Sequence, residues 1–332
     1  MGEFDLIARY FTRPTRRAAL GIGDDCALLQ PAPGTQLAIS CDMLVQGRHF
    51  FADVSPHSLG HKALAVNLSD LAACGAKPLA FSLALALPEV NEPWLAAFAQ
   101  GLFALADAHG CELIGGDTTA GPLNICITVF GEVPVVKGRS QALLRSGARA
   151  GDDLYVSGTL GDARLALQAQ QGRLSVPAPV LRAALERLER PTPRVALGLG
   201  LRGIASAAID LSDGFMGDLG HILECSQVGA TVQADQLVQC IGCYTKPGST
   251  RLKTGIELSV EQWRTLALAG GDDYELLFTA APEQRAAVAH AAQSSQTPVH
   301  RIGQIDARPG LRLLDENSQP LAQQFASFDH FA

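Results

Sequence analysis

The chain has 332 residues, enough for one large domain or two ordinary ones, each with its own buried core. Apolar residues make up 47% of it and charged residues 18%, which is too apolar and too weakly charged for intrinsic disorder. The formal net charge of -7 argues against a broad nucleic-acid-binding surface. It leaves room for an anionic substrate, which a few cations or a metal ion could hold.

No segment approaches the roughly eighteen uninterrupted apolar residues that a membrane-spanning helix needs. The longest apolar run, residues 79–87, is much shorter and ends at Pro88. Glu3 and Asp5 precede no apolar secretory core, and Leu6 stands where a myristoylation signal requires Ser or Thr. We therefore expect a soluble, cytoplasmic protein that does not contact membranes.

The eight cysteines do not form the paired pattern of a disulfide scaffold. Only Cys240 and Cys243 make a CxxC pair. A structural zinc site would need a second pair of ligands at suitable spacing, and none follows. An incidental pair in a polar loop is the simpler interpretation.

The first half of the chain alternates strand-like and helix-like segments. Apolar runs and period-two alternation predict strands at residues 37–40, 79–87, 113–115 and 124–133. Leucines at helical spacing predict a helix over residues 61–74, which Gly75 would end. A second helix is predicted over 93–109, between Pro93 in its first turn and Gly110 after its last.

The second half has the same alternating character. The polar stretch 136–151 is the best candidate linker, so we predict an α/β fold of two domains joined near residue 140. Beyond the linker, strands are predicted at residues 153–156, 207–211 and 275–279, and helices at residues 162–171, 180–189, 195–201, 215–225 and 282–293. Residues 239–256 are rich in turn-forming residues.

Aspartates recur where apolar runs end or beside glycines. They are Asp24, Asp25, Asp42, Asp70 and Asp117 in the first half, and Asp210, Asp213, Asp272 and Asp273 in the second. Loops at the ends of strands are where open α/β folds place their chemistry. Two carboxylates ~4 Å apart repel each other by about 4 kcal/mol at an effective dielectric constant of ~20. A divalent cation bound to their oxygens removes that repulsion. Because the neighbouring glycines also let backbone N–H groups approach phosphate, the pattern predicts a magnesium–phosphate site.

Single members of this set have simpler explanations. Asp24 or Asp25 could be a turn residue, and Asp213 could cap the helix that follows it. Asp70 is harder to explain in this way, because it lies inside an apolar helix where an unpaired carboxylate is costly. Residues 21–24 match neither a Walker A loop nor a GxGxxG motif. Spacing alone therefore indicates a magnesium–phosphate site and no particular reaction.

Seven blocks of the sequence resemble those of the thiamine-monophosphate kinase family, in the family's order. They are GIGDDCALL (21–29), SCDMLVQGRHF (40–50), KALAVNLSDLAACGAKP (62–78), LIGGDTT (113–119), RSGARAGD (145–152), AIDLSDG (208–214) and GGDDYEL (270–276), with DHF (329–331) at the end. The family belongs to the superfamily of aminoimidazole-ribonucleotide synthetase and selenophosphate synthetase. The resemblance implies an α/β (α+β) fold of two domains, the PurM-like architecture, with mixed sheets flanked by helices and the N-terminal sheet in a dimer interface.

The resemblance also implies a reaction. It is the ATP- and Mg²⁺-dependent phosphorylation of thiamine monophosphate to thiamine diphosphate by direct in-line transfer, the last step of thiamine diphosphate biosynthesis. Residues 1–138 would bind metal and ATP and form the dimer, and residues 139–332 would complete the ATP and substrate site. The implied partners are ATP, thiamine monophosphate, several Mg²⁺ ions and a second copy of the chain in a homodimer, without nucleic acid or membrane.

Carried over by position, the resemblance implies three groups of site residues. The metal group is Asp25, Ser40, Cys41, Asp42, Asp70, Asp117, Asp210 and Asp213; the ATP group is Gly116, Asp117, Arg145 and Ser212; the substrate group is His49, Asp272 and Phe328. No catalytic side chain is implied beyond those that position metal and phosphate. The acceptor phosphate is already ionised near neutral pH, so the transfer requires no general base and no covalent phospho-enzyme.

The sequence departs from the family's pattern at several positions. Cys41 stands where Thr is usual, Asp272 where the longer Glu is common, and Gln46 and Arg48 where Glu and Val are usual. Phe328 replaces a larger or hydroxylated aromatic residue, and it could stack on a substrate ring without offering a polar group. None of these departures affects the central aspartates.

Two other interpretations remain open. A sister ATP-dependent synthetase would use the same metal and nucleotide core. The selenophosphate enzymes, however, carry a reactive Cys or selenocysteine near a glycine-rich N-terminus, whereas the first cysteine here is Cys26, inside the metal motif. A binding protein without turnover would hold thiamine phosphate and not consume ATP. Pure binding would not need ligands from both halves of the chain, so the retained aspartates argue against it.

Overall fold

A computed structural model describes residues 2–243, 255–323 and 325 of the chain. The chain divides into two compact units. Unit 1 comprises Met1–Leu71 and Ala76–Ala142, and unit 2 comprises Ala72–Gly75 and Leu143–Ala332.

Unit 1 is built on a mixed sheet in the order β3-β6-β4-β5. These strands are β3 (Thr35–Val45), β6 (Asn124–Val136), β4 (Lys77–Leu87) and β5 (Glu112–Ala120). β6 runs antiparallel to both β3 and β4, whereas β4 and β5 are parallel. The short strand β7 (Arg139–Ser140) extends the end of β6, and β1 (Ala18–Leu20) and β2 (Leu28–Leu29) form a separate ribbon.

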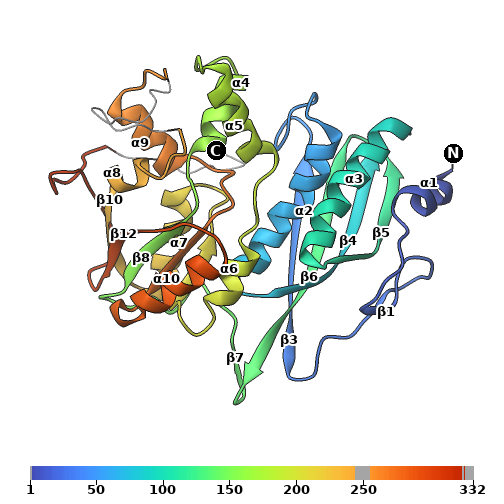
Figure 1. Ribbon diagram of the computed structural model, residues 1–332, viewed down its shortest axis with the longest axis horizontal. Coiled ribbons are helices and arrows are strands. Elements are labelled where there is room, and N and C mark those ends of the chain that lie inside the picture. The colour runs from blue at the N-terminus through green and yellow to red at the C-terminus, as the bar shows by residue number, and fades with distance from the viewer. Residues whose placement is uncertain (1, 244–254, 324, 326–332) are drawn as a thin grey trace. The chain divides into compact units, whose positions relative to one another are not determined.

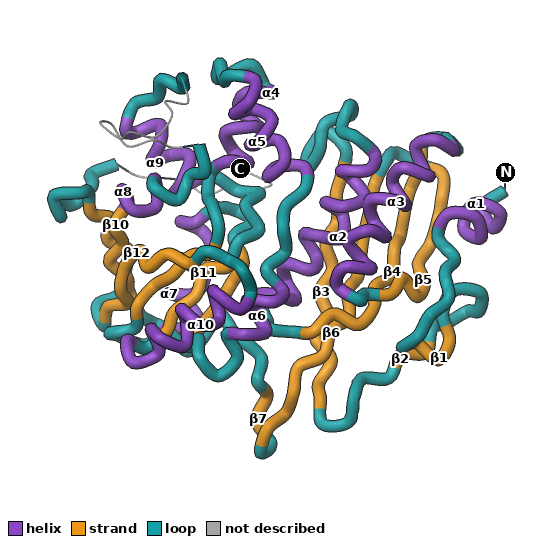
Figure 2. The backbone as a smooth tube through the Cα atoms, viewed as in Figure 1, coloured by secondary structure: helices purple, strands orange, loops and turns teal. Residues whose placement is uncertain are grey.

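Two long helices, α2 (Pro56–Ala73) and α3 (Glu92–His109), lie side by side against this sheet (Figures 1 and 2). They approach closely because glycines meet backbone: a Cβ on Gly60 would overlap the carbonyl oxygen of Phe98, and a Cβ on Gly101 would overlap that of His57. The shorter helix α1 (Glu3–Tyr10) packs near α3 and β5.

The predicted helix over 93–109 is confirmed, together with the signals that bound it. The Asn91 side chain accepts a hydrogen bond from the Trp94 N–H at 3.0 Å, and Gly110 ends the helix in the left-handed conformation with φ 57°. The helix predicted over 61–74 is also present, but it begins earlier, at Pro56, a favourable residue for a first turn.

The two faces of β3 differ. Ser40 points towards α2, whereas Leu37, Ile39 and Met43 alternate with it and are 44%, 60% and 52% exposed. We call the side of the sheet that carries these three apolar residues the open face. This mixed pattern explains why only residues 37–40 of the eleven-residue strand were predicted.

Unit 2 is built on a six-stranded sheet in the order β13-β10-β12-β8-β11-β9. The strands are β8 (Asp153–Ser157), β9 (Ala207–Asp210), β10 (Gly229–Gln233), β11 (Leu276–Ala280), β12 (Val299–Asp306) and β13 (Gly310–Leu314). All neighbouring pairs are antiparallel except β10 and β13. The predicted strands at 153–156, 207–211 and 275–279 correspond to β8, β9 and β11, within one residue at each end.

The helices of unit 2 are α4 (Asp162–Gln170), α5 (Ala178–Glu189), α6 (Val195–Gly200), α7 (Phe215–Ser226), α8 (Ala234–Val238), α9 (Val260–Ala269) and α10 (Arg285–Ser294), with a 3₁₀ turn at Pro282–Gln284. All five helices predicted in this half are confirmed. Phe215, Leu219 and Ile222 of α7 are buried in the core of this unit, as their helical spacing predicts.

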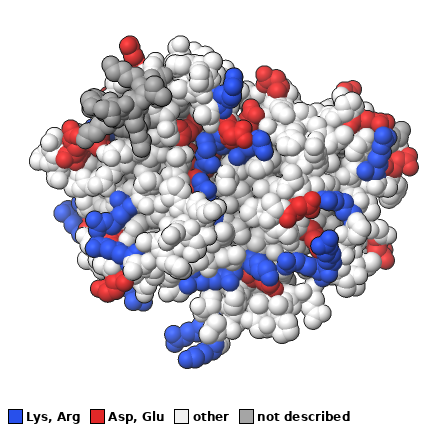
Figure 3. Space-filling view, viewed as in Figure 1, with Lys and Arg blue, Asp and Glu red and all other residues white. Residues whose placement is uncertain are grey.

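Among the described residues, no helix combines the length and apolar character that crossing a membrane requires. On the face shown in Figure 3, lysine and arginine side chains lie interspersed with aspartate and glutamate rather than in one continuous basic area. Both observations agree with the composition of the chain.

Candidate active site

In unit 1, the structure brings two of the predicted metal-site residues into contact. The Ser40 hydroxyl, on β3, donates a hydrogen bond of 2.5 Å to Oδ2 of Asp70 on α2. Asp70 is half-buried in a helix whose neighbouring residues are mostly buried. Asp70 therefore faces a polar partner on the sheet. An unpaired carboxylate in this apolar helix would be unfavourable, because it would lose its hydration without gaining a hydrogen bond.

Asn67, one turn before Asp70 on α2, holds the adjoining part of β3. Its Oδ1 accepts a hydrogen bond from the Asp42 N–H at 3.0 Å, and its Nδ2 donates to the Ala63 carbonyl at 3.0 Å. Asn67 is 1% exposed. Asn67 is not among the predicted site residues, although an amide inside an apolar helix is a signal that could have identified it. Asn67 fixes the main chain at Asp42 by a bond that an apolar residue could not make.

His49 is held by the turn that follows β3. Its Nδ1 accepts a hydrogen bond from the Val45 N–H at 3.0 Å, so the proton of the neutral ring lies on Nε2. The buried Lys62 donates its Nζ–H to the His49 carbonyl at 3.2 Å. The ring is thus fixed in both orientation and tautomer.

The predicted residues on β5 depend on a glycine. Gly116 has φ 144°, and a Cβ there would overlap the Leu83 carbonyl oxygen of β4. Only glycine fits this close approach of the two strands. Asp117 follows it directly, is exposed, and lies level with Ala84 in the sheet register.

Asp25 and Cys41 complete the predicted set in unit 1. Asp25 is exposed between β1 and β2, and its N–H donates to the neighbouring Asp24 carboxylate at 2.8 Å. Cys41 is exposed on the open face, with its sulfur 3.4 Å from that of Cys126. The hydrogen bonds given above between β3 and α2 link Ser40 with Asp70 and Asp42 with Asn67, and none of those given joins Asp25 or Asp117 to this pair of elements.

In unit 2, two predicted site loops are joined through their main chains. Asp210 ends β9 and lies opposite Leu276 of β11. Beyond this pair, the Asp272 N–H donates to the Ser212 carbonyl at 2.9 Å, and the Tyr274 N–H donates to the Leu211 carbonyl at 2.8 Å. The loop after β9, which carries the predicted residues Ser212 and Asp213, therefore holds the loop with Asp272 in a fixed register.

The second of these loops has an unusual backbone. Asp272 has φ 65° and Tyr274 has φ 50°, both in the left-handed region that side chains other than glycine rarely adopt. Asp273, between them, is buried, and both its carboxylate oxygens accept hydrogen bonds from the Gly161 N–H at 3.0 Å. Burial raises the pKa of the Asp273 carboxyl well above its usual value.

Glu275 anchors the loop to the core of the unit. Its side chain is fully buried and accepts hydrogen bonds from Arg187 at 2.7 Å, from Arg194 at 2.6 and 2.5 Å, and from the Ser157 hydroxyl at 2.5 Å. The same Arg187 also donates to the Asp273 carbonyl at 3.0 Å. A Cβ on Gly158 would overlap the carboxylate itself. Glu275 lies in the block 270–276, but nothing in the sequence indicates this network, because its partners are distant in the chain.

Asp213 begins a tight acidic turn before α7. The N–H groups of Asp213 and Gly214 donate to Oδ2 of Asp218 at 3.2 and 3.1 Å. Burial, followed by the charge of Asp213, raises the pKa of the Asp218 carboxyl to about 7. Asp213 is therefore not the helix cap: Gly214 stands at that position without a side-chain cap, and Asp218 of α7 instead binds the two N–H groups that precede the helix.

Arg145, the predicted nucleotide cation, is exposed on a loop fixed to the end of α7. The Ser226 hydroxyl donates to the Arg145 carbonyl at 3.2 Å and accepts from the N–H groups of Gly147 and Ala148. The predicted substrate residue Phe328 lies outside the described residues.

No three His, Cys, Asp or Glu side chains in the described part of the chain come close enough together to hold a metal ion by themselves. Burial raises the pKa of both Cys240 and Cys243 to about 12, so the CxxC pair carries neutral thiols. Mg²⁺ is ordinarily held by one or two carboxylates together with substrate phosphates rather than by a cage of protein ligands. The oxygen donors of both units suit that mode of binding.

Comparison with known proteins identifies the family. Residues 23–133 match the model of the AIR synthase related protein N-terminal domain, and residues 149–316 match that of the C-terminal domain. Thiamine-monophosphate kinase from Salmonella typhimurium is 46% identical over 337 residues, covering 100% of this chain and 98% of its own. The chain belongs to the thiamine-monophosphate kinase family.

Solved structures agree with this assignment. The thiamine-monophosphate kinase of Stenotrophomonas maltophilia K279a is 47% identical, with a TM-score of 0.79 over 93% of this chain and 94% of its own. AaThiL in complex with AMPPCP and TMP is 25% identical, with a TM-score of 0.72 over 91% and 89%. The predicted two-domain PurM-like fold is confirmed, and the chain is an enzyme of the kinase class.

Replacing Glu275 with Gln tests whether this buried carboxylate anchors the loop that carries Asp272, Asp273 and Tyr274. The variant leaves two buried guanidinium groups facing a neutral amide, so we expect the free energy of unfolding to fall by about 3–5 kcal/mol. Urea unfolding followed by circular dichroism measures the change. The matched control is Glu186→Gln, which breaks the exposed pair with Arg190 and should cost less than about 1 kcal/mol. Equal effects of the two substitutions would contradict the anchoring role.

Proposed function

We propose that the chain phosphorylates thiamine monophosphate to thiamine diphosphate with ATP and Mg²⁺, by direct in-line transfer. The observation that carries this proposal is the similarity, over 91% of the chain, to AaThiL in complex with AMPPCP, an ATP analogue, and TMP. The 46% identity with a relative named thiamine-monophosphate kinase over its whole length supports the same substrate.

Unit 1 would supply oxygen ligands for Mg²⁺ and the Nε2–H group of His49. Asp42 and Asp70, with Ser40 between strand and helix, would hold a magnesium ion from one side, together with the exposed Asp25 and Asp117. Gly116, which lets β5 approach the Leu83 backbone of β4 closely, would contact the nucleotide beside Asp117. His49 would contact the substrate phosphate through Nε2, which carries the ring proton.

The residues of unit 2 act as a pair of linked loops. Asp210 and Asp213 would contribute metal ligands, and Ser212 and Arg145 nucleotide contacts. Asp272 would contact the thiamine phosphate from the second loop, at a position set by its bond to Ser212. When bound, Mg²⁺ neutralises the repulsion between the donor and acceptor phosphates and helps to align them.

Proton transfer plays no part in this scheme. The acceptor is a phosphate oxygen that is already ionised near neutral pH, so no side chain needs to remove a proton. The work of the protein is to bind, align and neutralise two polyanions. This fits a candidate site built from aspartates and a histidine of defined tautomer.

Asp117→Asn tests the carboxylate set. The substitution removes one negative charge from an exposed side chain, so the fold should survive while turnover falls by roughly 10³-fold, the scale of losing a charge-stabilising group in phosphoryl transfer. ADP release and thiamine diphosphate formation measure turnover, and a thermal melt checks the fold. Asp53→Asn, which removes the same charge from an exposed residue of the same unit, is the control. Near-normal turnover in Asp117→Asn would falsify the role given to this carboxylate.

The chain also acts as a homodimer in this proposal, through the open face of the unit 1 sheet. Leu37, Ile39 and Met43 leave an apolar strip on β3 that water would otherwise cover, and burying it against a second copy would be favourable. The same face carries Cys41 and Cys126, whose sulfur atoms lie 3.4 Å apart, and burial raises the pKa of the Cys126 thiol to about 11.

Ile39→Lys tests the interface. A lysine at each copy's Ile39 would place like charges in an apolar contact, so we expect the dimer to dissociate into monomers. Sedimentation velocity at micromolar concentration measures the change. Val260→Lys is a close control, because Val260 is a β-branched residue of nearly the same exposure, 61% against 60%, but lies on α9. A dimer that survives Ile39→Lys, or a wild-type chain that is monomeric, would overturn this part of the proposal.

A further inference from the structure

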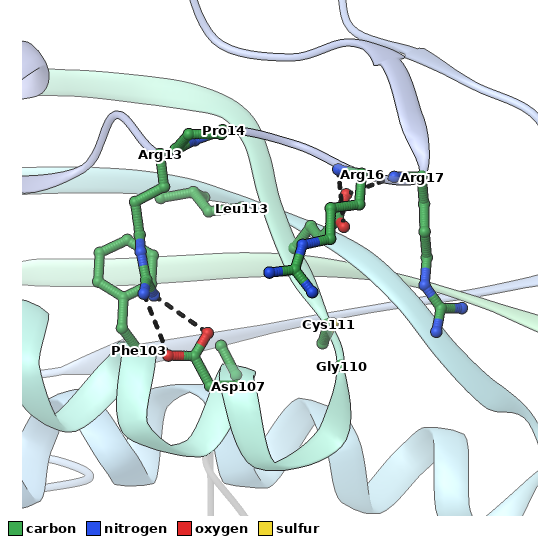
Figure 4. A pocket seen from close by; sticks show the side chains of 11 residues that line it. Arg13, Pro14, Arg16, Arg17, Phe103, Asp107, Gly110, Cys111 and Leu113 are labelled. Atoms are coloured by element: carbon green, nitrogen blue, oxygen red, sulfur yellow. Dashed lines mark hydrogen bonds and ion pairs between the residues drawn. The ribbon is translucent and has the colours of Figure 1, made fainter.

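A cavity of about 520 Å³ opens in unit 1, and none of the residues that line it belongs to the proposed active site (Figure 4). Residues 13–17, between α1 and β1, form one wall, and the end of α3 with the start of β5 forms the other. Three arginines, Arg13, Arg16 and Arg17, extend from the first wall towards the second. What each of them contacts decides what the cavity can hold.

Arg13 is already paired. Its guanidinium donates two hydrogen bonds, of 3.2 and 3.1 Å, to the Asp107 carboxylate of α3 and lies 4.4 Å above the centre of the Phe103 ring. The ion pair neutralises its charge, and the ring fixes its position. Arg13 therefore forms a rigid side of the cavity rather than a free cation.

Arg16 and Arg17 differ from Arg13, because their nearby carboxylate, that of Glu112, binds their main-chain N–H groups and not their guanidinium groups. The two oxygens of Glu112 accept hydrogen bonds from the N–H groups of Arg16 and Arg17, each at 3.0 Å. Within the described part of the chain, neither guanidinium has a hydrogen-bond or ion-pair partner. Glu112 thus fixes the backbone from which two unpaired cations project into one cavity.

The rest of the lining adds no competing anion. Burial raises the pKa of the Cys111 thiol to about 12, so this part of the wall is neutral. Three arginines against Asp107 and Glu112 leave the lining with a net positive charge. The C-terminal end of α3 attracts a cation and can account for Arg17, which lies near Gly110, but it does not account for Arg16 as well.

We propose that this cavity binds a phosphate group between Arg16 and Arg17, at a site separate from catalysis. Arg16 and Arg17 are consecutive residues whose guanidinium groups line the same cavity, and each can donate charged hydrogen bonds to phosphate oxygens. Pro14 and Leu113 give the cavity an apolar part beside these cations. The ligand is therefore free phosphate or a small phosphate ester whose organic part rests on that wall.

Calorimetric titration of the full chain with inorganic phosphate, in EDTA and without Mg²⁺, tests the site apart from any metal-dependent binding. We expect one phosphate per chain in the wild type. Arg16→Gln and Arg17→Gln should each weaken binding by about tenfold or more, because each removes charged hydrogen bonds to the anion. Arg9→Gln is the matched control: it removes the same charge from an exposed arginine that pairs with Glu92 outside the cavity.

The outcomes separate cleanly. Absence of metal-independent binding, or binding that is equal in all four proteins, overturns the proposal. Loss in Arg16→Gln and Arg17→Gln with none in Arg9→Gln supports it. A second titration with ribose 5-phosphate then identifies the source: tighter binding than inorganic phosphate indicates an ester that uses the apolar wall, and equal binding indicates the free anion. All three substituted side chains are exposed, so the variants should fold, and a thermal melt verifies this.

Discussion

A single buried carboxylate, Glu275, determines the position of the acidic loops in unit 2. It is enclosed between Arg187 and Arg194, and its backbone carbonyl accepts a hydrogen bond from the Leu211 N–H at 2.8 Å. Two ions buried together are costly unless every oxygen is hydrogen-bonded, and here the Ser157 hydroxyl completes the set. The network holds the left-handed turns at Asp272 and Tyr274 in place, so residues proposed to bind metal and substrate share one rigid support.

In unit 1, hydrogen bonds between α2 and β3 hold the proposed site residues in place. Asn67 and Asp70 are polar residues on the sheet-facing side of α2, and they bind the Asp42 N–H and the Ser40 hydroxyl of β3. The helix therefore fixes both the main chain and a side chain of the strand that carries the proposed ligands. In the function proposed above, these carboxylates would bind Mg²⁺ together with substrate phosphate oxygens. That mode of binding does not require three His, Cys, Asp or Glu side chains to come together, and in the described part of the chain no such group exists.

How far the sequence could predict this molecule differs between elements. The helix α3 was predictable because Asn91, Pro93 and Gly110 mark its ends locally, and α9 was missed although Ser259 and Gln262 form a capping box. β8, β9 and β11 were predictable because every residue in them is buried. β10, β12 and β13 were missed because their burial is mixed, with polar or partly exposed residues that interrupt the apolar run. The family resemblance supplied candidate ligands, but the partners that orient them, Asn67 and Glu275, depend on tertiary contacts that spacing does not reveal.

The most direct test of the central claim is a coupled assay of ADP release by the purified chain with ATP, thiamine monophosphate and Mg²⁺, and with each of the three omitted in turn. The account predicts ADP, and an equal amount of thiamine diphosphate, only when all three are present. ADP formed without thiamine monophosphate would indicate a sister synthetase with another acceptor. If no ADP formed under any condition while thiamine monophosphate still bound, the chain would be a binding protein, and the proposed phosphoryl transfer would be contradicted.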